Sequence, residues 1–399
     1  MSKLQELIQR LCPDGVEYKK LGEICIFKRG DVLSSKDAVE GDVPVMAGGQ
    51  KPSCYHNVPN RKGETIVVAG SGAYAGFVTY WNIPVFVSDA FSVHPIDGLL
   101  PKYVFHYLKN NQAKIHATKK GAGVPHVHGK DIAKFLIPVP PLEVQEEIVR
   151  ILDSFSDYAA ELQAELQARK EQYEYYRNLL LTFNPAGCAG EADDEQEGSV
   201  TTWGEHSYPI QWKTMGEIGK IKMCKRVMKN QTTDRGDIPF YKIGTFGKKA
   251  DAFISRKIFD EYKRLYSYPR KGTILVSASG TIGRCVVYEG EEAYYQDSNI
   301  VWLDNDESIV LNTYLYHYYQ IVNWNTEGGT IKRLYNDRFA STPIPVPPLE
   351  LQEKIVAVLD RFETLVNDLS EGLPAEIAAV KEQYEYYRNR LLTFKEKTA

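Results

Sequence analysis

The residue types that could support catalysis occur in two short patterns. Gly70, Gly72 and Gly76 form a GxGxxxG sequence, but it is one residue longer than the dinucleotide-binding fingerprint and belongs to a turn that occurs twice in the chain. Pro13-Asp14 followed by Glu17-Tyr18-Lys19 resembles the PD…ExK pattern of nucleases, but its carboxylates lie too close together and no strand flanks them. The sequence has no P-loop and no Asn-Pro-Pro-Tyr-type methyltransferase motif. We therefore expect no catalytic residue in this chain.

The histidines and cysteines could bind a metal, but their spacing argues against it. His126-Val-His128 could place two imidazoles on one face of a strand, yet no further Cys, His or acidic residue follows in a ligand pattern. The six cysteines are scattered and form no CxxC pair, which fits neither a zinc site nor a disulfide framework and suits a reducing compartment. We expect no metal in the chain.

Basic residues cluster in stretches that look like loops, next to glycine, serine or aromatic residues. Lys and Arg on loops neutralise phosphates, while Arg, Asn, Gln, Ser and His can contact base edges. These clusters could serve solubility alone, and charge by itself does not favour DNA binding over that interpretation. They contain Lys28, Arg29, Gln50, Lys51, Tyr55, Lys119 and Lys120 in the first half, and Lys225, Arg226, Lys248, Lys249, Arg284, Lys332 and Arg333 in the second.

The net charge of −4, from 48 basic and 52 acidic residues, argues weakly against a nucleic-acid partner when it is taken alone. Its distribution changes that interpretation. The net charge is +5 over residues 1–136, −5 over 137–183, −5 over 184–200, +4 over 201–343 and −3 over 344–399. Two basic segments thus alternate with acidic ones, as expected for two DNA-facing domains and an acidic spacer.

An internal repeat explains this alternation. Ile137–Glu143 recurs as Ile344–Glu350, and Lys170–Asn178 recurs without change as Lys381–Asn389. The chain of 399 residues therefore contains two copies of one unit, each a variable globular segment followed by a near-identical helical segment. Strand-like runs such as Thr65–Ala69 and aromatic helical runs predict mixed α and β structure for the globular segments. We interpret residues 184–200, rich in Gly, Ala and acid, as a linker.

The helical segments carry long apolar seams with heptad spacing. In the first copy only Arg169 interrupts the seam, which would be about 50 Å long. The second copy contains a four-residue stutter at Leu369–Leu373–Ile377, and Gly372 and Pro374 predict a kink or break there. The helices could pack on their own domains or pair with each other, and we favour an antiparallel pair that forms a rod with one domain at each end. The seam positions are Ile148, Leu152, Phe155, Ala159, Leu162, Leu166, Tyr173, Tyr176, Leu180 and Phe183 in the first copy, and Ile355, Leu359, Phe362, Val366, Leu369, Leu373, Ile377, Val380, Tyr384, Tyr387, Leu391 and Phe394 in the second.

The first helical segment contains a tandem tetrapeptide, Ala-Glu-Leu-Gln, at residues 160–167. This could be ordinary helix-favouring composition. It could also be a length element, because each four-residue unit would lengthen a helix by about 6 Å.

Two variable domains, each followed by Pro-Val-Pro-Pro-Leu-Glu-x-Gln and a long helix, resemble the specificity subunit of type I restriction-modification enzymes. The resemblance rests on Ile137–Gln145, Ile344–Gln352 and the two Lys-Glu-Gln-Tyr-Glu-Tyr-Tyr-Arg-Asn blocks. It implies an α+β fold with two α/β target-recognition domains, residues 1–136 and 201–343, separated by two long antiparallel coiled-coil helices in a pseudo-two-fold repeat. Gly372-Leu-Pro374, present only in the second helix, departs from that symmetry.

The resemblance also implies a division of labour. The chain would bind double-stranded DNA with a split target sequence, use its helices as a ruler, and dock two methyltransferase subunits, which motor-nuclease subunits then join. Methylation, ATP-driven translocation and cleavage would belong to those partners. S-adenosylmethionine, ATP and Mg²⁺ are therefore expected in the partners, with no cofactor in this chain.

Further site residues follow from the family pattern. The loops after the repeated turn and before each helical segment align between the copies, with His126 and His128 opposite Arg333 and Tyr335. These loops add Ser71, Tyr74, His126, His128, Ser279, Thr281 and Tyr335 to the DNA-binding candidates. The expected partner-binding residues are Tyr175, Tyr176, Arg177, Tyr386, Tyr387 and Arg388.

Two other functions remain open at this point. The chain could be the recognition subunit of another restriction class, with a fused methyltransferase-nuclease partner, or a coiled-coil scaffold that binds only proteins. The N-terminus lacks an apolar secretion region and no run approaches 18 apolar residues. We therefore expect a cytoplasmic protein of a bacterium or archaeon, without a membrane partner.

Overall fold

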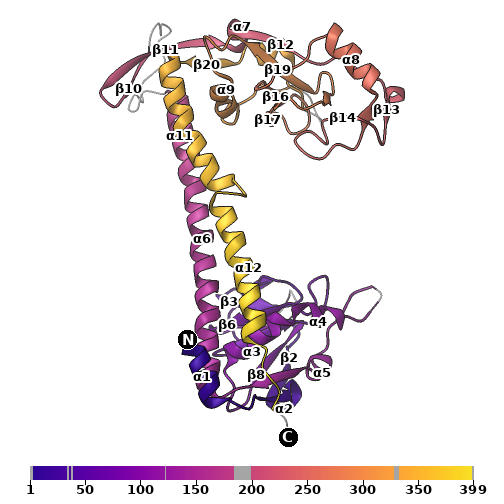
Figure 1. Ribbon diagram of the computed structural model, residues 1–399, viewed down its shortest axis with the longest axis vertical. Coiled ribbons are helices and arrows are strands. Elements are labelled where there is room, and N and C mark those ends of the chain that lie inside the picture. Colours follow the sequence, from indigo (N-terminus) through magenta and orange to yellow (C-terminus); the bar gives the residue numbers. More distant parts are fainter. Residues whose placement is uncertain are drawn as a thin grey trace. The chain divides into compact units, whose positions relative to one another are not determined.

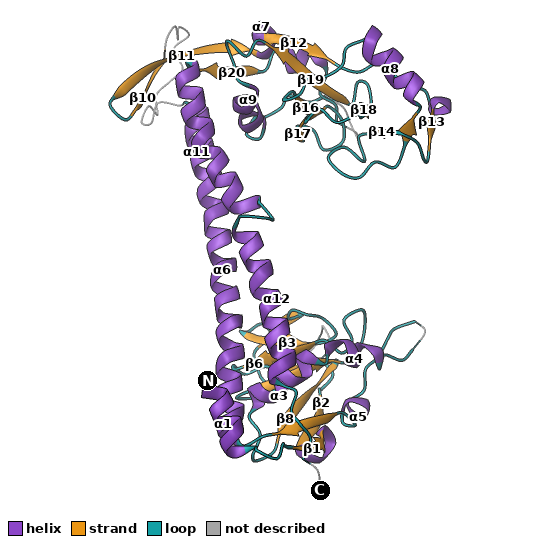
Figure 2. Cartoon of the chain, viewed as in Figure 1, coloured by secondary structure: helices purple, strands orange, loops and turns teal. Residues whose placement is uncertain are grey.

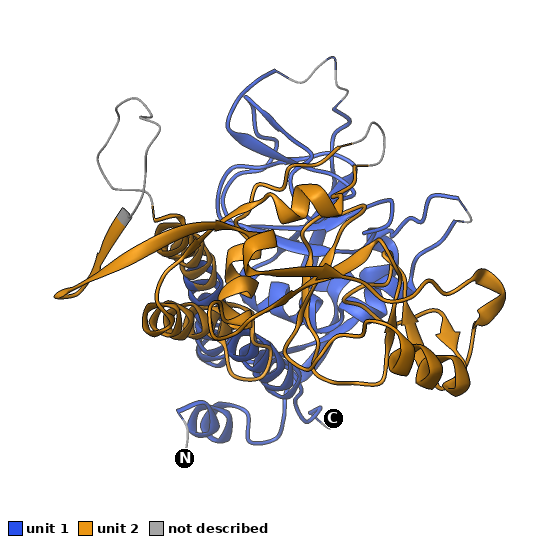
Figure 3. Cartoon of the chain, turned by 90° about the horizontal axis from the view of Figure 1, so that it is seen from above, with its two compact units in different colours: residues 1–165, 375–399 blue, residues 166–374 orange. Residues whose placement is uncertain are grey.

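The structure is a computed structural model that describes residues 3–33, 36, 39–121, 123–183, 199–327 and 332–397. The chain forms two compact units, which Figure 3 distinguishes by colour. Unit 1 contains Met1–Glu165 and Ala375–Ala399, and unit 2 contains Leu166–Pro374. Both unit boundaries fall inside long helices, so the predicted segment boundaries stay predictions. Residues 184–198 of the expected linker lie outside the described residues.

The globular part of unit 1 contains strands and short helices (Figure 2). Its main sheet is antiparallel with strand order β2-β8-β5-β6, and the strands of a smaller sheet, with order β4-β3-β7, lie between β2 and β8 in the sequence. Its central strand β5 is buried along its whole length. The elements are α1 (Lys3–Leu11), β1 (Glu17–Lys20), α2 (Leu21–Ile24), β2 (Cys25–Arg29), β3 (Val43–Met46), β4 (Cys54–His56), β5 (Thr65–Ala69), β6 (Val78–Trp81), β7 (Phe86–Val87), β8 (Ala90–Pro95), α3 (Pro101–Asn110), α4 (Gln112–Ala117), α5 (Gly129–Ile132) and β9 (Leu136–Val139).

The globular part of unit 2 repeats this topology. Its main sheet has the order β12-β19-β16-β17, and β14 pairs with β18 in parallel as β3 pairs with β7. The elements are β10 (Ser199–Trp203), β11 (His206–Thr214), α7 (Met215–Ile218), β12 (Gly219–Lys222), η1 (Lys229–Gln231), β13 (Thr232–Thr233), β14 (Ile238–Tyr241), β15 (Phe253–Ile254), α8 (Arg256–Leu265), β16 (Ile274–Ser277), β17 (Cys285–Val287), β18 (Tyr294–Tyr295), β19 (Ile300–Asn305), α9 (Asn312–Tyr319), α10 (Asn336–Ala340) and β20 (Pro343–Val346).

Each unit contains a pair of helix segments. Helix α6 (Leu142–Thr182) is continuous over 41 residues, about 60 Å at 1.5 Å per residue, and contributes its first part to unit 1 and its second part to unit 2. In unit 1 it packs beside α12 (Leu373–Leu391) (Figure 1). There the ring of Phe155 stacks on that of Tyr387, with centroids 5.4 Å apart. In unit 2 it packs beside α11 (Leu349–Asn367), where Tyr176 stacks on Phe362 at 5.8 Å.

The second helical segment breaks where the stutter predicts it. Helix α11 ends at Asn367, and α12 begins at Leu373. Asp368 Oδ1 accepts a hydrogen bond from Ser370 N at 2.6 Å, and a Cβ on Gly372 would lie 2.4 Å from the carbonyl oxygen of Thr364. Leu369, expected in the apolar seam, is instead 82% exposed, because it lies in the turn between the two helices.

The repeated Pro-Val-Pro-Pro-Leu-Glu-x-Gln motif anchors each long helix to its globular part. The buried Gln145 donates to the carbonyl oxygens of Pro140 and Gly98 and accepts from Leu100 N at 3.0 Å, directly before α3. In unit 2, Gln352 makes the same three bonds before α9, to the oxygens of Pro347 and Ile309 and from the nitrogen of Leu311. The motif is therefore a structural anchor whose buried amide is fully hydrogen-bonded.

The first and last parts of the chain meet in unit 1. Val16 N donates to Lys395 O at 2.9 Å, and Lys397 N donates to Val16 O at 3.0 Å. The Tyr18 hydroxyl donates to Phe394 O at 2.9 Å, and Leu392 belongs to the same buried cluster as the core of β5. Unit 1 thus depends on residues from both ends of the sequence. None of the helices in the described part of the chain combines the length and the apolar character needed to cross a membrane.

Candidate nucleic-acid interface

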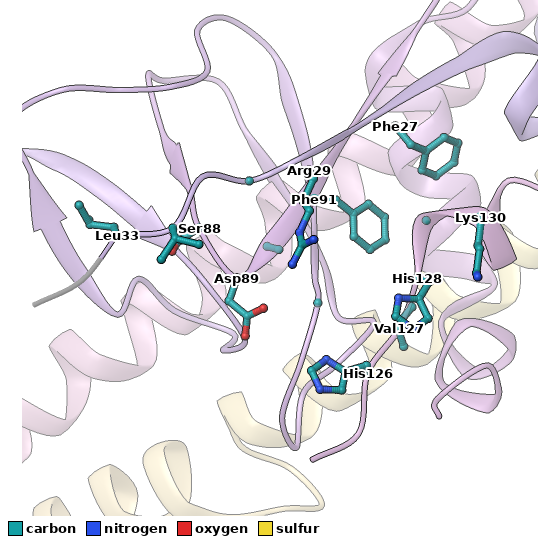
Figure 4. Close-up of a pocket in the computed structure, with 15 residues that line it drawn as sticks. Phe27, Arg29, Leu33, Ser88, Asp89, Phe91, His126, Val127, His128 and Lys130 are labelled. Atoms are coloured by element: carbon teal, nitrogen blue, oxygen red, sulfur yellow. The ribbon is translucent and has the colours of Figure 1, made fainter. Parts of the chain in front are cut away.

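A hollow of about 590 Å³ opens on the globular part of unit 1 (Figure 4). Strand β2 contributes Arg29 at its end, the turn after β5 contributes Gly70, and the link between β7 and β8 contributes Asp89. The segment before α5 supplies the remaining polar wall with His126 and His128. We call this space hollow 1. Its lining is Phe27, Arg29, Gly30, Val32, Leu33, Gly70, Ser88, Asp89, Ala90, Phe91, His126, Val127, His128, Gly129 and Lys130.

Backbone hydrogen bonds fix the walls of hollow 1. Val127 N donates to Gly70 O at 2.9 Å, and Gly70 N donates to Asp89 O at 3.0 Å. Isolated bridges join His126 to Ser71 and to Lys120. Three segments that are distant in sequence are therefore held together by main-chain bonds, which leave the exposed side chains free to vary.

The exposed side chains of hollow 1 combine donors with one strong acceptor. The rings of His126 and His128 stack with centroids 6.4 Å apart and an angle of 7° between their planes. Asp89 accepts a hydrogen bond from the Ser71 hydroxyl through one carboxylate oxygen. Arginine and histidine can donate to guanine or adenine edges, whereas a carboxylate accepts from the amino group of cytosine. This mixture suits contact with base edges better than contact with phosphates alone, because Asp89 would repel a phosphate.

Arg61 holds one wall of hollow 1 in place. No sequence pattern indicated this role. This arginine is buried, with Nε donating to Ser92 Oγ at 2.8 Å and Nη2 donating to Arg29 O at 2.7 Å. Burial lowers the pKa of Arg61, and the nearby Asp31 opposes that shift. Arg61 therefore orients the end of β2, and with it the backbone of Arg29, without entering the hollow.

Unit 2 contains a matching hollow of about 300 Å³, here called hollow 2. Its frame repeats that of hollow 1, because Leu334 N donates to Ala278 O at 2.9 Å and bridges join Arg333 to Ser279 and to Glu327. Ala278 N in turn donates to Asn299 O at 2.8 Å. The lining residues are Met223, Ala278, Ser298, Arg333, Leu334, Tyr335, Asn336 and Asp337.

The two hollows share a backbone frame but differ in their side chains. His126 of hollow 1 corresponds to Arg333 of hollow 2, because both residues pair with the serine after the repeated turn. His128 then corresponds to Tyr335, and Lys130 to Asp337. Asp89, Lys130, Asn336 and Asp337 were not among the predicted site residues. Alignment of the segments before each long helix could have revealed Lys130, Asn336 and Asp337, whereas Asp89 joins the hollow only through backbone pairing in the fold.

The other candidates of unit 1 lie outside hollow 1. Lys119 Nζ donates to Ala73 O at 3.0 Å, and Lys120 forms an ion pair with Asp131 at 2.7 Å that holds the pKa of this carboxyl below its ordinary value. These lysines therefore stabilise the loops next to hollow 1 through contacts within unit 1. Lys28, Gln50, Lys51, Tyr55 and Tyr74 are exposed, and Ser71 is buried beneath Asp89.

The candidates of unit 2 are divided between a third hollow and separate contacts. Lys248, Thr281 and Arg284 line a hollow of about 290 Å³, in which Arg284 Nη1 donates to Phe246 O at 3.0 Å. Arg226 forms an ion pair with Asp297 at 2.8 Å, and Lys225 Nζ lies 5.0 Å from the ring centre of Tyr266. Ser279 is buried, whereas Lys249 and Lys332 are exposed. DNA contact by any of these residues stays a prediction.

The expected partner-binding residues fall into two groups. Tyr175 and Tyr386 are 63% and 58% exposed. The others contact their own unit: Tyr176 and Tyr387 stack on Phe362 and Phe155, Arg177 donates to Gln320 at 3.0 Å and Arg388 donates to Asn110 at 3.3 Å. Of these six residues, only Tyr175 and Tyr386 therefore expose more than half of the side chain to another protein.

One group of side chains in the described residues has atoms close enough together to share a metal ion: His317, Asp360 and Glu363, with ligand atoms within 4.8 Å of one another. His126 and His128 do not belong to it. Its members already have partners, since His317 Nε2 lies 2.7 Å from Asp360 and Glu363 accepts from Tyr316 at 2.7 Å. Hydrogen bonding accounts for the cluster, and we assign no metal to it.

A duplicated α/β fold, two matched hollows and two helix pairs define a class of two-domain recognition protein. The DNA specificity domain of type I restriction modification matches residues 13–171 and 209–379. The chain belongs to the type I restriction-modification specificity family.

Relatives and solved structures agree with this assignment. A type I restriction enzyme specificity subunit sequence of Haemophilus influenzae is 42% identical over 95% of this chain and 96% of its own length. A type I specificity subunit of Escherichia coli is 30% identical over 74% and 71%. The crystal structure of an S subunit from M. genitalium has a TM-score of 0.57 at 16% identity, over 95% of this chain and 96% of that one. A chain from a structure of type I complex assembly has a TM-score of 0.56 at 19% identity, over 96% and 98%, and these two likenesses show the shared fold.

The predicted family is thereby confirmed, and so is the prediction of a type I specificity subunit with two DNA specificity domains. The mixed α and β content of the two globular parts is confirmed as well. The scaffold and other-class alternatives have no support in these comparisons.

Proposed function

We propose that each globular part recognises one half of a split DNA target, and that hollow 1 and hollow 2 supply the base contacts. The observation that carries this proposal is the pairing of one backbone frame with two different sets of side chains. A constant frame would approach both half-sites in the same way, while the different side chains would select different bases. The basic charge of each globular segment would add attraction to the phosphates.

The helices would serve as ruler and docking surface. The length of α6 would set the number of base pairs between the half-sites, and the repeated tyrosine blocks would dock two methyltransferase subunits on equivalent surfaces. The exposed Tyr175 and Tyr386 support this role, because exposed aromatic side chains are common in protein interfaces. We also propose that the two helical segments form an antiparallel coiled coil. The proposal further includes a cytoplasmic location and no catalysis by this chain.

Catalysis and cofactors would belong to the partners. S-adenosylmethionine would bind the methyltransferase subunits, and ATP with Mg²⁺ would bind the motor-nuclease subunits. This chain would supply the sequence preference that directs both activities to the same site.

Substitution in hollow 1 tests the proposal. The variant His126→Ala with His128→Ala, assembled with its methyltransferase subunits, should lose preference in one half-site and keep the other half-site and the gap. Each lost base contact should cost about tenfold or more in discrimination, because such contacts contribute roughly 1–3 kcal/mol. Sequencing of methylated sites in a random DNA library measures both halves together.

Lys114→Ala is the matched control, because Lys114 is an exposed basic residue of α4 outside hollow 1. It should leave both halves unchanged. Relaxation of both halves by the histidine variant, or of neither, would contradict the assignment of hollow 1 to one half-site.

A further inference from the structure

A buried histidine in unit 1 links the globular part to both helices of the pair. His106 of α3 is 1% exposed. Its Nε2 lies 2.9 Å from Oδ1 of Asp153 on α6, and its Nδ1 lies 3.1 Å from the hydroxyl of Tyr384 on α12. Lys102 Nζ lies 2.5 Å from the other carboxylate oxygen of Asp153. A single imidazole therefore connects three helices from distant parts of the chain.

Unit 2 contains the same arrangement with residues from the other copy. His317 of α9 is fully buried, and its Nε2 lies 2.7 Å from Asp360 of α11. Its Nδ1 lies 3.5 Å from the hydroxyl of Tyr173 on α6. Asp153 and Asp360 occupy equal positions in the repeat, as do Tyr384 and Tyr173. The arrangement is thus a property of the repeat, and we call each copy a His-Asp-Tyr link.

The ionised Asp153 fixes the direction of one of the two hydrogen bonds of His106. Burial raises the pKa of Asp153, but the hydrogen bonds from His106 and Lys102 outweigh that effect and lower it overall. The ionised carboxylate can only accept, so Nε2 of His106 carries the proton. The other ring nitrogen, Nδ1, then pairs with the hydroxyl of Tyr384, which can donate or accept. Loss of that hydroxyl would leave a buried ring nitrogen without its partner.

The surrounding contacts are equally constant. Helices α3 and α9 share the sequence Tyr-x-x-His-Tyr. The first tyrosine of each, Tyr103 and Tyr314, donates to the backbone oxygen of Pro138 and Pro345 at 3.0 Å in both units. These bonds join the sequence to β9 and β20, the strands directly before α6 and α11, in the same way in both units, whereas the side chains of hollow 1 and hollow 2 differ.

We propose that His106 and His317 are positioning residues that hold each globular part in one orientation on its helix pair. They do so through their contacts with Tyr384 and Tyr173, the first tyrosines of the two Lys-Glu-Gln-Tyr-Glu-Tyr-Tyr-Arg-Asn blocks. This inference rests on the proposed function, because orientation matters to activity only if the globular part contacts DNA. Neither histidine lines a hollow. Loss of a link should therefore alter how a half-site is presented and leave the choice of bases intact.

The variant Tyr384→Phe tests the link in unit 1 with the smallest possible change. Hydrogen exchange of the isolated chain should become faster in α3, while the sheet β2-β8-β5-β6 keeps its protection. In the assembled complex, methylation of a library with variable gaps should keep both half-site sequences. Preference for the correct gap over its neighbours should fall about tenfold, because a buried polar group without a partner typically costs about a factor of ten in an equilibrium.

Tyr80→Phe is the control, because the Tyr80 hydroxyl bonds to Glu64 within the globular part and should leave gap preference unchanged. His106→Gln combined with Tyr384→Phe should lose no more gap preference than the stronger single variant, since both act on one link. Unchanged exchange in α3 and unchanged gap preference in Tyr384→Phe would overturn the inference. A wild-type complex that methylates no split target would instead overturn the proposed function, and the exchange result would still decide the link.

Discussion

Single residues in this protein divide into those that vary between the copies and those that do not. Gln145 and Gln352 make the same three hydrogen bonds, whereas the residues of the hollows change from histidine to arginine and tyrosine. Because buried polar groups need specific partners, the constant residues preserve the frame. The exposed side chains of the hollows lack that constraint, so they can differ between the two copies, as expected if each copy binds a different half-site.

Glu147 on α6 should make stability depend on acid pH. Hydrogen bonds from Arg150, opposed by burial and aided by Lys3, lower its pKa to about 2. A carboxyl whose folded pKa lies below its unfolded pKa of about 4.3 stabilises the folded state above that value, and the gain disappears as pH falls toward 2. Glu147→Gln should therefore lower the free energy of unfolding of unit 1 by about 1–2 kcal/mol at pH 7, and the deficit should shrink between pH 5 and pH 2.5.

Urea unfolding of wild type and variant, followed at both ends of that pH range, measures this difference. Glu143→Gln changes an exposed acid of the same helix and provides the comparison. A deficit for Glu147→Gln that stays constant from pH 7 to pH 2.5 would exclude the carboxylate as its source.

At the scale of elements, the sequence predicted the helices and strands that recur in the two copies. It did not predict the hollows, which form by contacts between segments far apart in the chain. The heptad spacing predicted the long helix, and the stutter with Gly372 predicted the break before α12. β-Rich runs such as Thr65–Ala69 predicted strands. Leu369 could not be placed correctly, because spacing alone does not distinguish a seam position from an exposed turn within a stutter. The hollows could not be predicted either, since Arg29, Asp89 and His126 meet only through backbone pairing between segments far apart in the chain.

Removal of residues 164–167, one Ala-Glu-Leu-Gln unit of α6, should shorten the gap in the target. Four residues account for about 6 Å of helix, which corresponds to roughly one to two base-pair steps at 3.4 Å each. Both half-sites should stay the same, because hollow 1 and hollow 2 lie outside this segment.

Methylation mapping of the deletion variant gives the gap and the half-sites in one experiment. A variant with Ala at both Gln163 and Gln167, which keeps the helix length, serves as the control. An altered half-site with an unchanged gap would rule out the role of α6 as a ruler.

For the whole molecule, we expect the duplicated frame to make the globular parts exchangeable. Replacement of residues 1–136 by the corresponding segment of another family member should change one half-site and leave the other half-site and the gap intact. The exchange should succeed best when the incoming segment keeps the Tyr-x-x-His-Tyr sequence of α3, because its histidine contacts α6 and α12 and its first tyrosine bonds to β9. The methylome of a cell that carries the chimaera reports the result, and a change in both half-sites would contradict separate recognition by the two units.

The composition of unit 1 from both ends of the chain also governs the order of events during synthesis. Unit 2 is one continuous stretch, Leu166–Pro374, whereas unit 1 needs Ala375–Ala399 to be complete. On the ribosome, the second half of the protein can therefore finish folding before the first half. Until the last residues emerge, His106 lacks Tyr384 and Val16 lacks its backbone partners. A nascent chain stalled before residue 375 would expose part of the core of unit 1 to chaperones and proteases, although unit 2 would already be complete.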